Sequence, residues 1–220
     1  MEKQKYAAIV LAAGSGKRMN SKVHKQYLII QDRPVLYYSL KAFEDSAVDE
    51  IVLVVGKGEE KFCRKEIVDK YGISKVKAIV EGGKERYHSV FEGLKQTSDA
   101  DYVLIHDGAR PYVSKQSIND LVECLKTYDA GLLMVPCKDT IKEVKEGIVV
   151  KTLKRETLMQ AQTPQVFKSE DIKVAYQKAK DEGYVATDDS QLFERYIDKD
   201  IKAVLGDYSN LKITTQEDLR

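Results

Sequence analysis

Glycines and basic residues gather in the stretch that follows the first apolar run of this sequence. Residues 11–19 read Leu-Ala-Ala-Gly-Ser-Gly-Lys-Arg-Met, and Lys25 follows. Glycine lets backbone N–H groups face a ligand without a Cβ in the way, and nests of such amides backed by cations suit polyphosphates. A dinucleotide fingerprint would need a third glycine at Met19, and a Walker A loop would need Ser or Thr after Lys17. The stretch therefore predicts a polyphosphate site of another kind. The alternative is a tight turn without a ligand, and the nearby cations favour the site.

A second group with chemical potential is His-Asp-Gly-Ala-Arg-Pro, residues 106–111. Asp107 is a candidate Mg²⁺ ligand, because this hard cation prefers carboxylate oxygen and commonly shares itself with substrate phosphates. Arg110 offers a planar fork for a phosphate, with an ion pair as its alternative role. His106 invites a catalytic interpretation, but a histidine at a strand end is more often structural, and we leave it out of the site.

Three further segments add polar groups whose roles stay open. Gly82-Gly83 can be a simple turn, and Asp188-Asp189 can begin a helix, since acidic residues favour a first turn. Asp188 and Asp189 also resemble paired carboxylates for acid-base chemistry, although nothing in the sequence fixes their separation. The segments are Gly82 to Arg86 with Ser89, the Asp139-Thr140 pair with Arg155 and Thr163, and Thr187-Asp188-Asp189.

The elements that must position these residues alternate between strands and helices. Short β-branched runs predict strands over 7–11, 51–55, 76–80, 102–106 and 131–135. Apolar residues at helical spacing predict helices over 34–43, 59–71, 85–96 and 114–128. The expected fold is α/β, a Rossmann-like, mostly parallel sheet flanked by helices. Ligands bind such sheets at the carboxyl ends of the strands, where the first two motifs lie.

The alternation stops at residue 139. Residues 140–145 and 148–153 read as two strands around Glu146-Gly147, which predicts a protruding β-hairpin arm over about 138–160. The arm would expose apolar residues unless something covers them. A second subunit is one candidate, and folding back on its own domain is the other. We expect residues 1–220 to form a single domain that carries this arm.

Composition restricts the partners and the compartment. Lys plus Arg number 36 against 35 for Asp plus Glu, so no net field attracts nucleic acid or a membrane surface. Cys63, Cys124 and Cys137 are odd in number and lack CxxC spacing, which argues against a disulfide framework or a structural zinc site. The first apolar run, 6–13, is too short for a membrane span. A cytoplasmic protein is expected.

Taken together, the motifs resemble the 2-C-methyl-D-erythritol 4-phosphate cytidylyltransferases of the non-mevalonate isoprenoid pathway over nearly the whole chain. The resemblance implies a fold of the nucleotide-diphospho-sugar transferase type and transfer of CMP from CTP to a polyol phosphate, with Mg²⁺ and release of pyrophosphate. The segments that carry it are 11–19, Lys25-Gln26-Tyr27, 82–86 with Ser89, 106–111, Lys138-Asp139-Thr140, 162–165, 187–189 and 210–214.

The resemblance also assigns roles to residues. It implies nucleotide contacts at Ala12, Ala13, Gly14, Gly16, Arg18, Lys25, Gly83 and Ser89. It implies Mg²⁺ binding at Asp107, and contacts to the polyol phosphate at Asp107, Arg110, Asp139, Thr140, Arg155, Thr163, Thr187 and Lys212. The implied catalytic residues are Arg18, Lys25, Arg155 and Lys212. The family is typically a homodimer whose arm reaches the partner's site, which would place Thr140 and Arg155 across the interface.

Two departures and two alternatives qualify this prediction. His24 stands where many relatives have proline, and Lys84 replaces a frequent acidic residue, so the geometry of both loops is in question. Ribitol 5-phosphate cytidylyltransferases share the motifs, including the tail over 208–215. The Arg155 to Phe167 stretch favours the methylerythritol group. A nucleotide-binding regulator without turnover would be expected to lack Arg18, Lys25 or Asp107, and all three are present.

Overall fold

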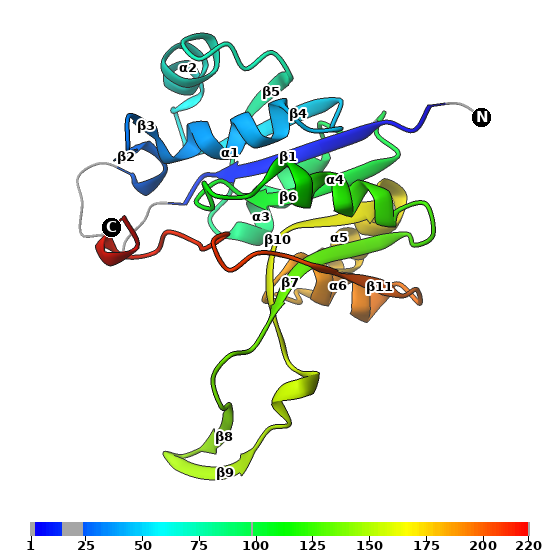
Figure 1. Cartoon of the computed structure of the whole chain (residues 1–220). Helices are drawn as coiled ribbons and strands as arrows, with labels where there is room; N and C mark the ends of the chain where they lie inside the picture. The colour runs from blue at the N-terminus through cyan, green and yellow to red at the C-terminus, as the bar shows by residue number, and fades with distance from the viewer. Residues whose placement is uncertain (1–2, 15–23, 98, 220) are drawn as a thin grey trace.

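The fold is built on a seven-stranded sheet in which all strands but one run parallel (Figure 1). The computed structural model describes residues 3–14, 24–97 and 99–219. Only β10 runs antiparallel to its neighbours, β6 and β7. In spatial order the strands are β11 (Ile201–Leu205), β7 (Ala130–Pro136), β10 (Met159–Lys168), β6 (Tyr102–Asp107), β1 (Tyr6–Ala12), β4 (Glu50–Val55) and β5 (Val76–Glu81).

Helices cover both faces of the sheet because strand residues alternate between two apolar cores. Ala8 and Val10 of β1 belong to a core shared with α1 (Val35–Glu44), α2 (Glu60–Cys63) and α4 (Lys115–Cys124). Ala7 and Ile9 belong to the opposite core, shared with three other helices. Those helices are α3 (Arg86–Leu94), α5 (Ser169–Glu182) and α6 (Asp189–Tyr196). The shorter elements are the 3-10 helices Lys25–Tyr27, Arg155–Thr157 and Gln216–Leu219 and the small strands β2 (Ile29–Ile30) and β3 (Arg33–Pro34).

The five predicted strands are confirmed to within one residue at each end, as β1, β4, β5, β6 and β7. The predicted helix over 59–71 is only partly right. It begins as α2 and continues from Arg64 to Asp69 as a π-helix, a wider turn that apolar spacing does not distinguish from an α-helix. Pro34 caps α1 instead of lying in its first turn. The predicted helix over 114–128 ends at Cys124.

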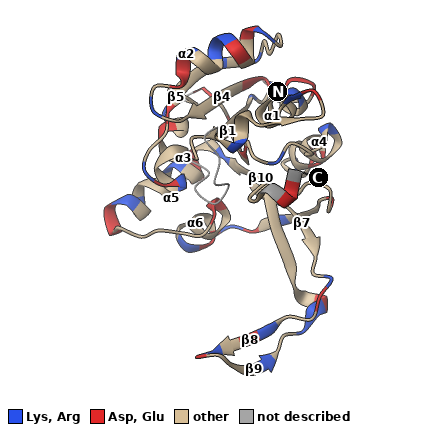
Figure 2. Ribbon diagram, turned by 90° about the vertical axis from the view of Figure 1, so that its left-hand side faces the viewer, with Lys and Arg blue, Asp and Glu red and all other residues tan. Residues whose placement is uncertain are grey.

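The predicted arm is confirmed. Strands β8 (Lys142–Lys145) and β9 (Ile148–Thr152) pair only with each other and project from the body, carrying charges of both signs (Figures 1 and 2). The connecting residues Glu146 and Gly147 both have positive φ, 51° and 80°, as the favoured two-residue hairpin turn requires. The hairpin does not fold back on its own chain, so that alternative is wrong. Apolar side chains on it are more than half exposed: Val144, Ile148, Val149 and Val150.

Two expectations from composition can be compared with the structure. Cys63, Cys124 and Cys137 are all free thiols. Within the described part of the chain, no helix combines the length and the apolar character needed to cross a membrane.

Candidate active site

A cavity of about 440 Å³ opens at the carboxyl ends of β1, β5 and β6, where parallel sheets bind their ligands. Its lining joins segments that are far apart in the sequence. Four basic side chains and two acidic ones contribute, so basic residues outnumber acidic ones in the lining. The lining residues are Leu11, Ala12, Ala13, Gly14, Lys25, Gln26, Gly83, Lys84, Glu85, Arg86, Ser89, Asp107, Ala109, Lys212 and Thr214.

Gln26 and Lys25 fasten one wall of the cavity. Gln26 is buried, and its Nε2 donates to the carbonyl oxygen of Ala12 at 2.6 Å, at the last residue of β1. Lys25 Nζ donates to the carbonyl oxygen of Ile213 at 2.9 Å, near the other end of the chain. A buried amide and a charged donor thus hold the short helix Lys25–Tyr27 against the sheet, and Lys25 remains in the cavity lining.

The loop after β5 forms the facing wall, and it needs glycine because its backbone lies very close to its neighbours. A Cβ on Gly82 would lie 2.5 Å from Ala13 Cβ and 2.6 Å from Ser89 Oγ. Ser89 is buried, and its hydroxyl accepts from the Gly83 N–H at 3.2 Å and lies 3.2 Å from the Glu85 carbonyl. Ser89 therefore shapes this loop from within, and Gly82 lets the loop approach the end of β1.

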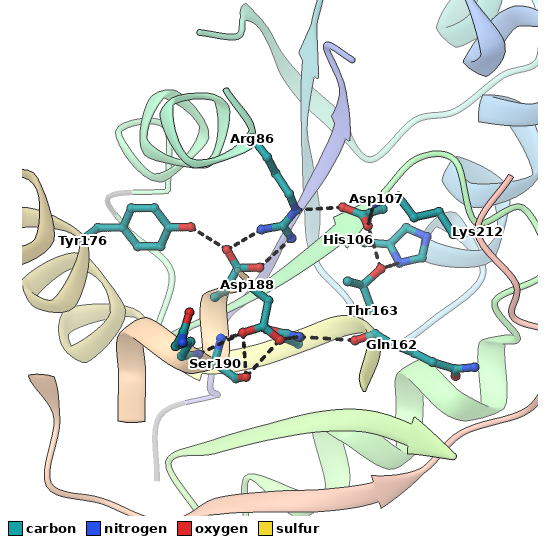
Figure 3. Close-up of polar contacts among 12 residues, drawn as sticks. Arg86, His106, Asp107, Gln162, Thr163, Tyr176, Asp188, Ser190 and Lys212 are labelled. Atoms are coloured by element: carbon teal, nitrogen blue, oxygen red, sulfur yellow. Dashed lines mark hydrogen bonds and ion pairs between the residues drawn. The ribbon is translucent and has the colours of Figure 1, made fainter. Parts of the chain in front are cut away.

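Asp107, the last residue of β6, holds two cations of the cavity in place (Figure 3). Its Oδ1 accepts from Arg86 Nε at 2.9 Å, and its Oδ2 accepts from Lys212 Nζ at 2.7 Å. Burial alone would raise the pKa of this carboxyl, but Arg86 and Lys212 outweigh burial and hold the pKa well below its usual range. Asp107 is therefore ionised at neutral pH, and each of its oxygens faces a positive side chain.

A second carboxylate holds Arg86 from the other side. Asp189, on the first turn of α6, is fully buried and accepts from Arg86 Nη1 at 2.9 Å and from Nη2 at 2.6 Å. The hydroxyl of Tyr176 on α5 also donates to Asp189. Burial favours the neutral form of Arg86, yet Asp189 and Asp107 raise its pKa well above the usual value. The bidentate pair fixes the plane of the guanidinium beside the cavity.

His106 lies behind this cluster and is neutral. Burial, together with the nearby charge of Arg110, lowers its pKa to about 3. Its Nε2 lies 3.3 Å from the Arg110 carbonyl oxygen, which can only accept, so Nε2 carries the proton. Its Nδ1 then accepts from the Thr163 hydroxyl at 3.1 Å, and that hydroxyl accepts from the Asp107 N–H at 3.0 Å. His106 thus orients the end of β6, which agrees with its exclusion from the predicted site.

Comparisons with known proteins identify the family of this chain. The model of the family "IspD: 2-C-methyl-D-erythritol 4-phosphate cytidylyltransferase" matches residues 6–220. The chain belongs to this family. The 2-C-methyl-D-erythritol 4-phosphate cytidylyltransferases of Lachnoclostridium phytofermentans and Alkaliphilus metalliredigens are each 46% identical over 98% of the chain, covering 94% and 90% of those proteins.

Solved structures of the family share the fold. The 4-diphosphocytidyl-2C-methyl-D-erythritol synthase of Anaerococcus prevotii superposes with a TM-score of 0.87 at 37% identity, over 98% of this chain and 93% of that one. The 2-C-methyl-D-erythritol 4-phosphate cytidylyltransferase of Francisella tularensis gives a TM-score of 0.81 at 31% identity, over 98% and 97%.

Most of the residues that are expected to contact the nucleotide in a cytidylyltransferase of this family line the cavity. Gly16 and Arg18 lie outside the described residues, so their expected contacts stay predictions. Of the residues expected around the polyol phosphate, Asp107 and Lys212 also line the cavity. The residues expected to contact the nucleotide that line the cavity are Ala12, Ala13, Gly14, Lys25, Gly83 and Ser89.

The other expected contacts to the polyol phosphate do not line the cavity. Arg110 Nη1 donates to the Asn210 carbonyl at 2.7 Å, and Thr163 is buried behind Asp107. Thr187 is exposed before α6. Three more are exposed near the base of the arm, where Arg155 donates to the Lys138 carbonyl: Asp139, Thr140 and Arg155. Within one chain the arm residues do not contribute to the cavity wall.

The donor set offers a limited seat for a metal ion. Among the described residues, no group of three or more His, Cys, Asp or Glu side chains could hold one. Asp107 is ionised and lines the cavity, but both of its oxygens already face cations. Mg²⁺ commonly takes only one or two carboxylates and completes its shell with phosphates and water. Asp107 therefore fits a single protein ligand to an ion that substrate phosphates hold.

Sequence reasoning missed Arg86, Asp189 and Gln26 as site residues. Arg86 stood within the recognised motif over 82–86, but its two carboxylate partners are 21 and 103 residues away. Asp188 is the N-cap of α6, and its side chain accepts from the Gln191 N–H. The interpretation of Asp188-Asp189 as a helix start is confirmed. Asp189 pairs with Arg86, so the pair is not available as two acid-base carboxylates.

Proposed function

We propose that this chain transfers CMP from CTP to 2-C-methyl-D-erythritol 4-phosphate, giving 4-diphosphocytidyl-2-C-methyl-D-erythritol and pyrophosphate. The observation that carries the proposal is the cation-lined cavity at the carboxyl ends of β1 and β6, in a chain that belongs to this family. Lys25, Arg86 and Lys212 supply positive charge there, which suits one triphosphate and one phosphate monoester.

The chemistry needs positioning more than proton transfer. An oxygen of the acceptor's phosphate monoester is already anionic at neutral pH, so it attacks the α-phosphorus of CTP without a general base. The new bond joins that oxygen to the α-phosphorus, the bond to the bridging oxygen breaks, and pyrophosphate leaves with the electron pair. No proton has to be removed from the acceptor in this step, so the neutral, buried His106 is not needed as a base.

The described side chains have complementary roles in this step. Lys25 stabilises the charge that develops around the α-phosphate, and Arg18 is proposed to assist it. Lys212 contacts the acceptor phosphate. Asp107 holds Lys212 and Arg86 toward the cavity through its two oxygens. Asp107, together with the triphosphate, would hold a Mg²⁺ ion, which would supply charge neutralisation for the leaving group.

The arm supports the proposal that the active species is a homodimer. Val144, Ile148, Val149 and Val150 leave an apolar surface that a second copy would cover. In that arrangement Thr140 and Arg155 act in the partner's site. Light scattering at micromolar protein is expected to give about twice the chain mass of 24.9 kDa. A fully active monomer would contradict a role for Thr140 and Arg155 across subunits.

The function is tested by pyrophosphate release with CTP and Mg²⁺. 2-C-Methyl-D-erythritol 4-phosphate and D-ribitol 5-phosphate are compared as acceptors, and ATP, GTP and UTP replace CTP in controls. Strong preference for CTP with the first acceptor supports the proposal. Preference for ribitol phosphate would keep the chemistry and replace the acceptor. CTP binding without pyrophosphate release in the presence of either acceptor would contradict catalysis.

A further inference from the structure

The segment after β11, residues 206–213, connects the base of the arm to the cavity, and we call it the C-terminal strap. It passes the place where β7 and β10 leave the body (Figure 1). Lys212, near its end, lines the cavity. The Gly206 N–H donates to the Met134 carbonyl of β7 at 2.9 Å. A Cβ on Gly206 would lie 2.5 Å from Gln162 Oε1 of β10, so the strap starts in close contact with both arm-bearing strands.

Tyr208 joins the strap to the base of the arm. Its hydroxyl donates to the Pro136 carbonyl at 2.7 Å, at the last residue of β7. Lys138 Nζ lies 3.5 Å from the centre of the Tyr208 ring. A cation at that distance over an aromatic face is attracted to it. Tyr208 is 42% exposed, so these two contacts, more than burial, hold its side chain in place.

Asn210 holds the middle of the strap. It is buried, and its Nδ2 donates to the Thr163 carbonyl at 3.0 Å and to Gln162 Oε1 at 3.3 Å. Its backbone carbonyl oxygen accepts from Arg110 Nη1 at 2.7 Å. Asn210 therefore joins the strap to β10 on one side and to the loop after β6 on the other. These buried hydrogen bonds hold the middle of the strap in place.

The last residues of the strap contact Lys25 and carry Lys212, two of the four basic residues that line the cavity. The Ile213 N–H donates to the Ala109 carbonyl at 2.8 Å, and the Ile213 carbonyl accepts from Lys25 Nζ at 2.9 Å. Between Asn210 and Ile213, Lys212 reaches Asp107. Any shift of the strap along its length would therefore move Lys212 and the acceptor of Lys25 together.

We propose that Tyr208 is a positioning residue that couples the base of the arm to the placement of Lys212. Its contacts with Pro136 and Lys138 fix the position of the strap relative to the base of the arm. The hydrogen bonds of Asn210 keep the rest of the strap in line, so that this position also sets where Lys212 lies. The functional consequence rests on the proposed role of Lys212 in CMP transfer, but the coupling itself is a property of the chain without substrate. A movement at the base of the arm would then displace Lys212, although no arm residue lines the cavity of the same chain.

Hydrogen exchange tests the coupling without any substrate. Tyr208→Phe removes the bond to Pro136 and keeps the ring under Lys138, whereas Tyr208→Ala removes both contacts. In Tyr208→Phe we expect amide exchange in a peptide covering 209–214, which contains the protected Ile213 N–H, to be about five-fold faster, the factor for one lost hydrogen bond. Tyr208→Ala is expected to show a larger increase.

Tyr6→Phe is the matched control. It removes a 2.8 Å hydroxyl bond to Gln4 at the amino end of β1, far along that strand from the cavity. Exchange of the β1 amides, which reports opening of the core, should be the same in all variants. Exchange over 209–214 that is unchanged in Tyr208→Ala, or accelerated as much by Tyr6→Phe, would overturn the coupling.

The rate of CMP transfer provides a second readout. With fixed CTP, kcat is expected to fall in the order wild type, Tyr208→Phe, Tyr208→Ala, by about five-fold at the first step, with wild-type turnover in Tyr6→Phe. Faster exchange without any change in kcat would overturn the link to Lys212 and leave the proposed function intact. A wild-type chain without CMP transfer would contradict the proposed function and leave the exchange result valid.

Discussion

Asp189→Asn isolates the buried carboxylate that orients Arg86. The substitution keeps the size of the side chain and removes its charge. Asp189 is fully buried, and it accepts both Nη groups of Arg86 and the hydroxyl of Tyr176. In the variant the arginine keeps Asp107 as its one ionic partner among the described residues, and that carboxylate is shared with Lys212.

The expected loss of stability follows from burial. Removing one partner of a buried ion pair costs about 3–5 kcal/mol, because the remaining charge is left without compensation. The Arg86 side chain is 29% exposed and keeps Asp107, so the lower end, about 3 kcal/mol, applies. For a chain of this size each kcal/mol shifts Tm by about 2–4 °C, so Tm should fall by roughly 6–12 °C.

Urea unfolding followed by circular dichroism measures the change, with Asp188→Asn as the control. Asp188 is the neighbouring N-cap of α6, and asparagine caps a helix about as well as aspartate, so the control should lose less than about 1 kcal/mol. Pyrophosphate release should also fall in Asp189→Asn at temperatures where the variant is folded. If Asp189→Asn is destabilised no more than Asp188→Asn, the assignment of Asp189 as the main partner of Arg86 is wrong.

Four further predictions concern the cavity and the arm. Lys25→Ala should lower kcat by about two to four powers of ten while circular dichroism reports a folded chain; nearly normal turnover would refute its electrostatic role. Gly82→Ala should weaken CTP binding in calorimetry and cost about 1–3 kcal/mol in urea, because the new Cβ meets Ala13 and Ser89; unchanged affinity would contradict that loop geometry. Because the pKa of Asp107 is lower in the folded chain than in the unfolded chain, ionised Asp107 stabilises the fold at pH values above its unfolded pKa of about 4. This stabilisation is lost as the pH falls toward the folded pKa. Tm measured against pH should therefore decline less steeply in acid for Asp107→Asn than for the wild type. Ile148→Asp on the arm should reduce the mass found by light scattering to that of one chain, whereas an unchanged mass would exclude the arm from the interface.

The sequence predicts the central sheet well where local pattern and burial agree. The β-branched runs of β1, β4 and β6 are buried on both faces, so apolar character alone marks them. β10 was missed because Gln160, Gln162 and Thr163 interrupt its apolar pattern and Pro164 lies within it. α5 has buried apolar residues at Ile172, Ala175, Tyr176 and Ala179, and this helical spacing is enough to predict the helix from the sequence.

The site divides in the same way between local and distant information. Lys25, Gly83 and Asp107 lie within short motifs whose residue types already suit phosphates, and all three line the cavity. The pairing of Arg86 with Asp189 joins residues 103 positions apart, and one sequence does not reveal such a partner. The proposed placement of the arm residues in a partner's site would need a second copy of the chain, which composition and spacing do not specify.

The position of β10 in the sheet has a consequence for synthesis of the protein. β10 lies between β6 and β7, although it follows both in the sequence. Until residue 168 has left the ribosome, β6 and β7 have no shared neighbour, and their facing edges are unpaired. Lys212 comes later still, so a nascent chain can complete the half of the sheet around β1 and β4 early. It acquires Lys212, one of the four basic residues that line the cavity, only near the end of translation.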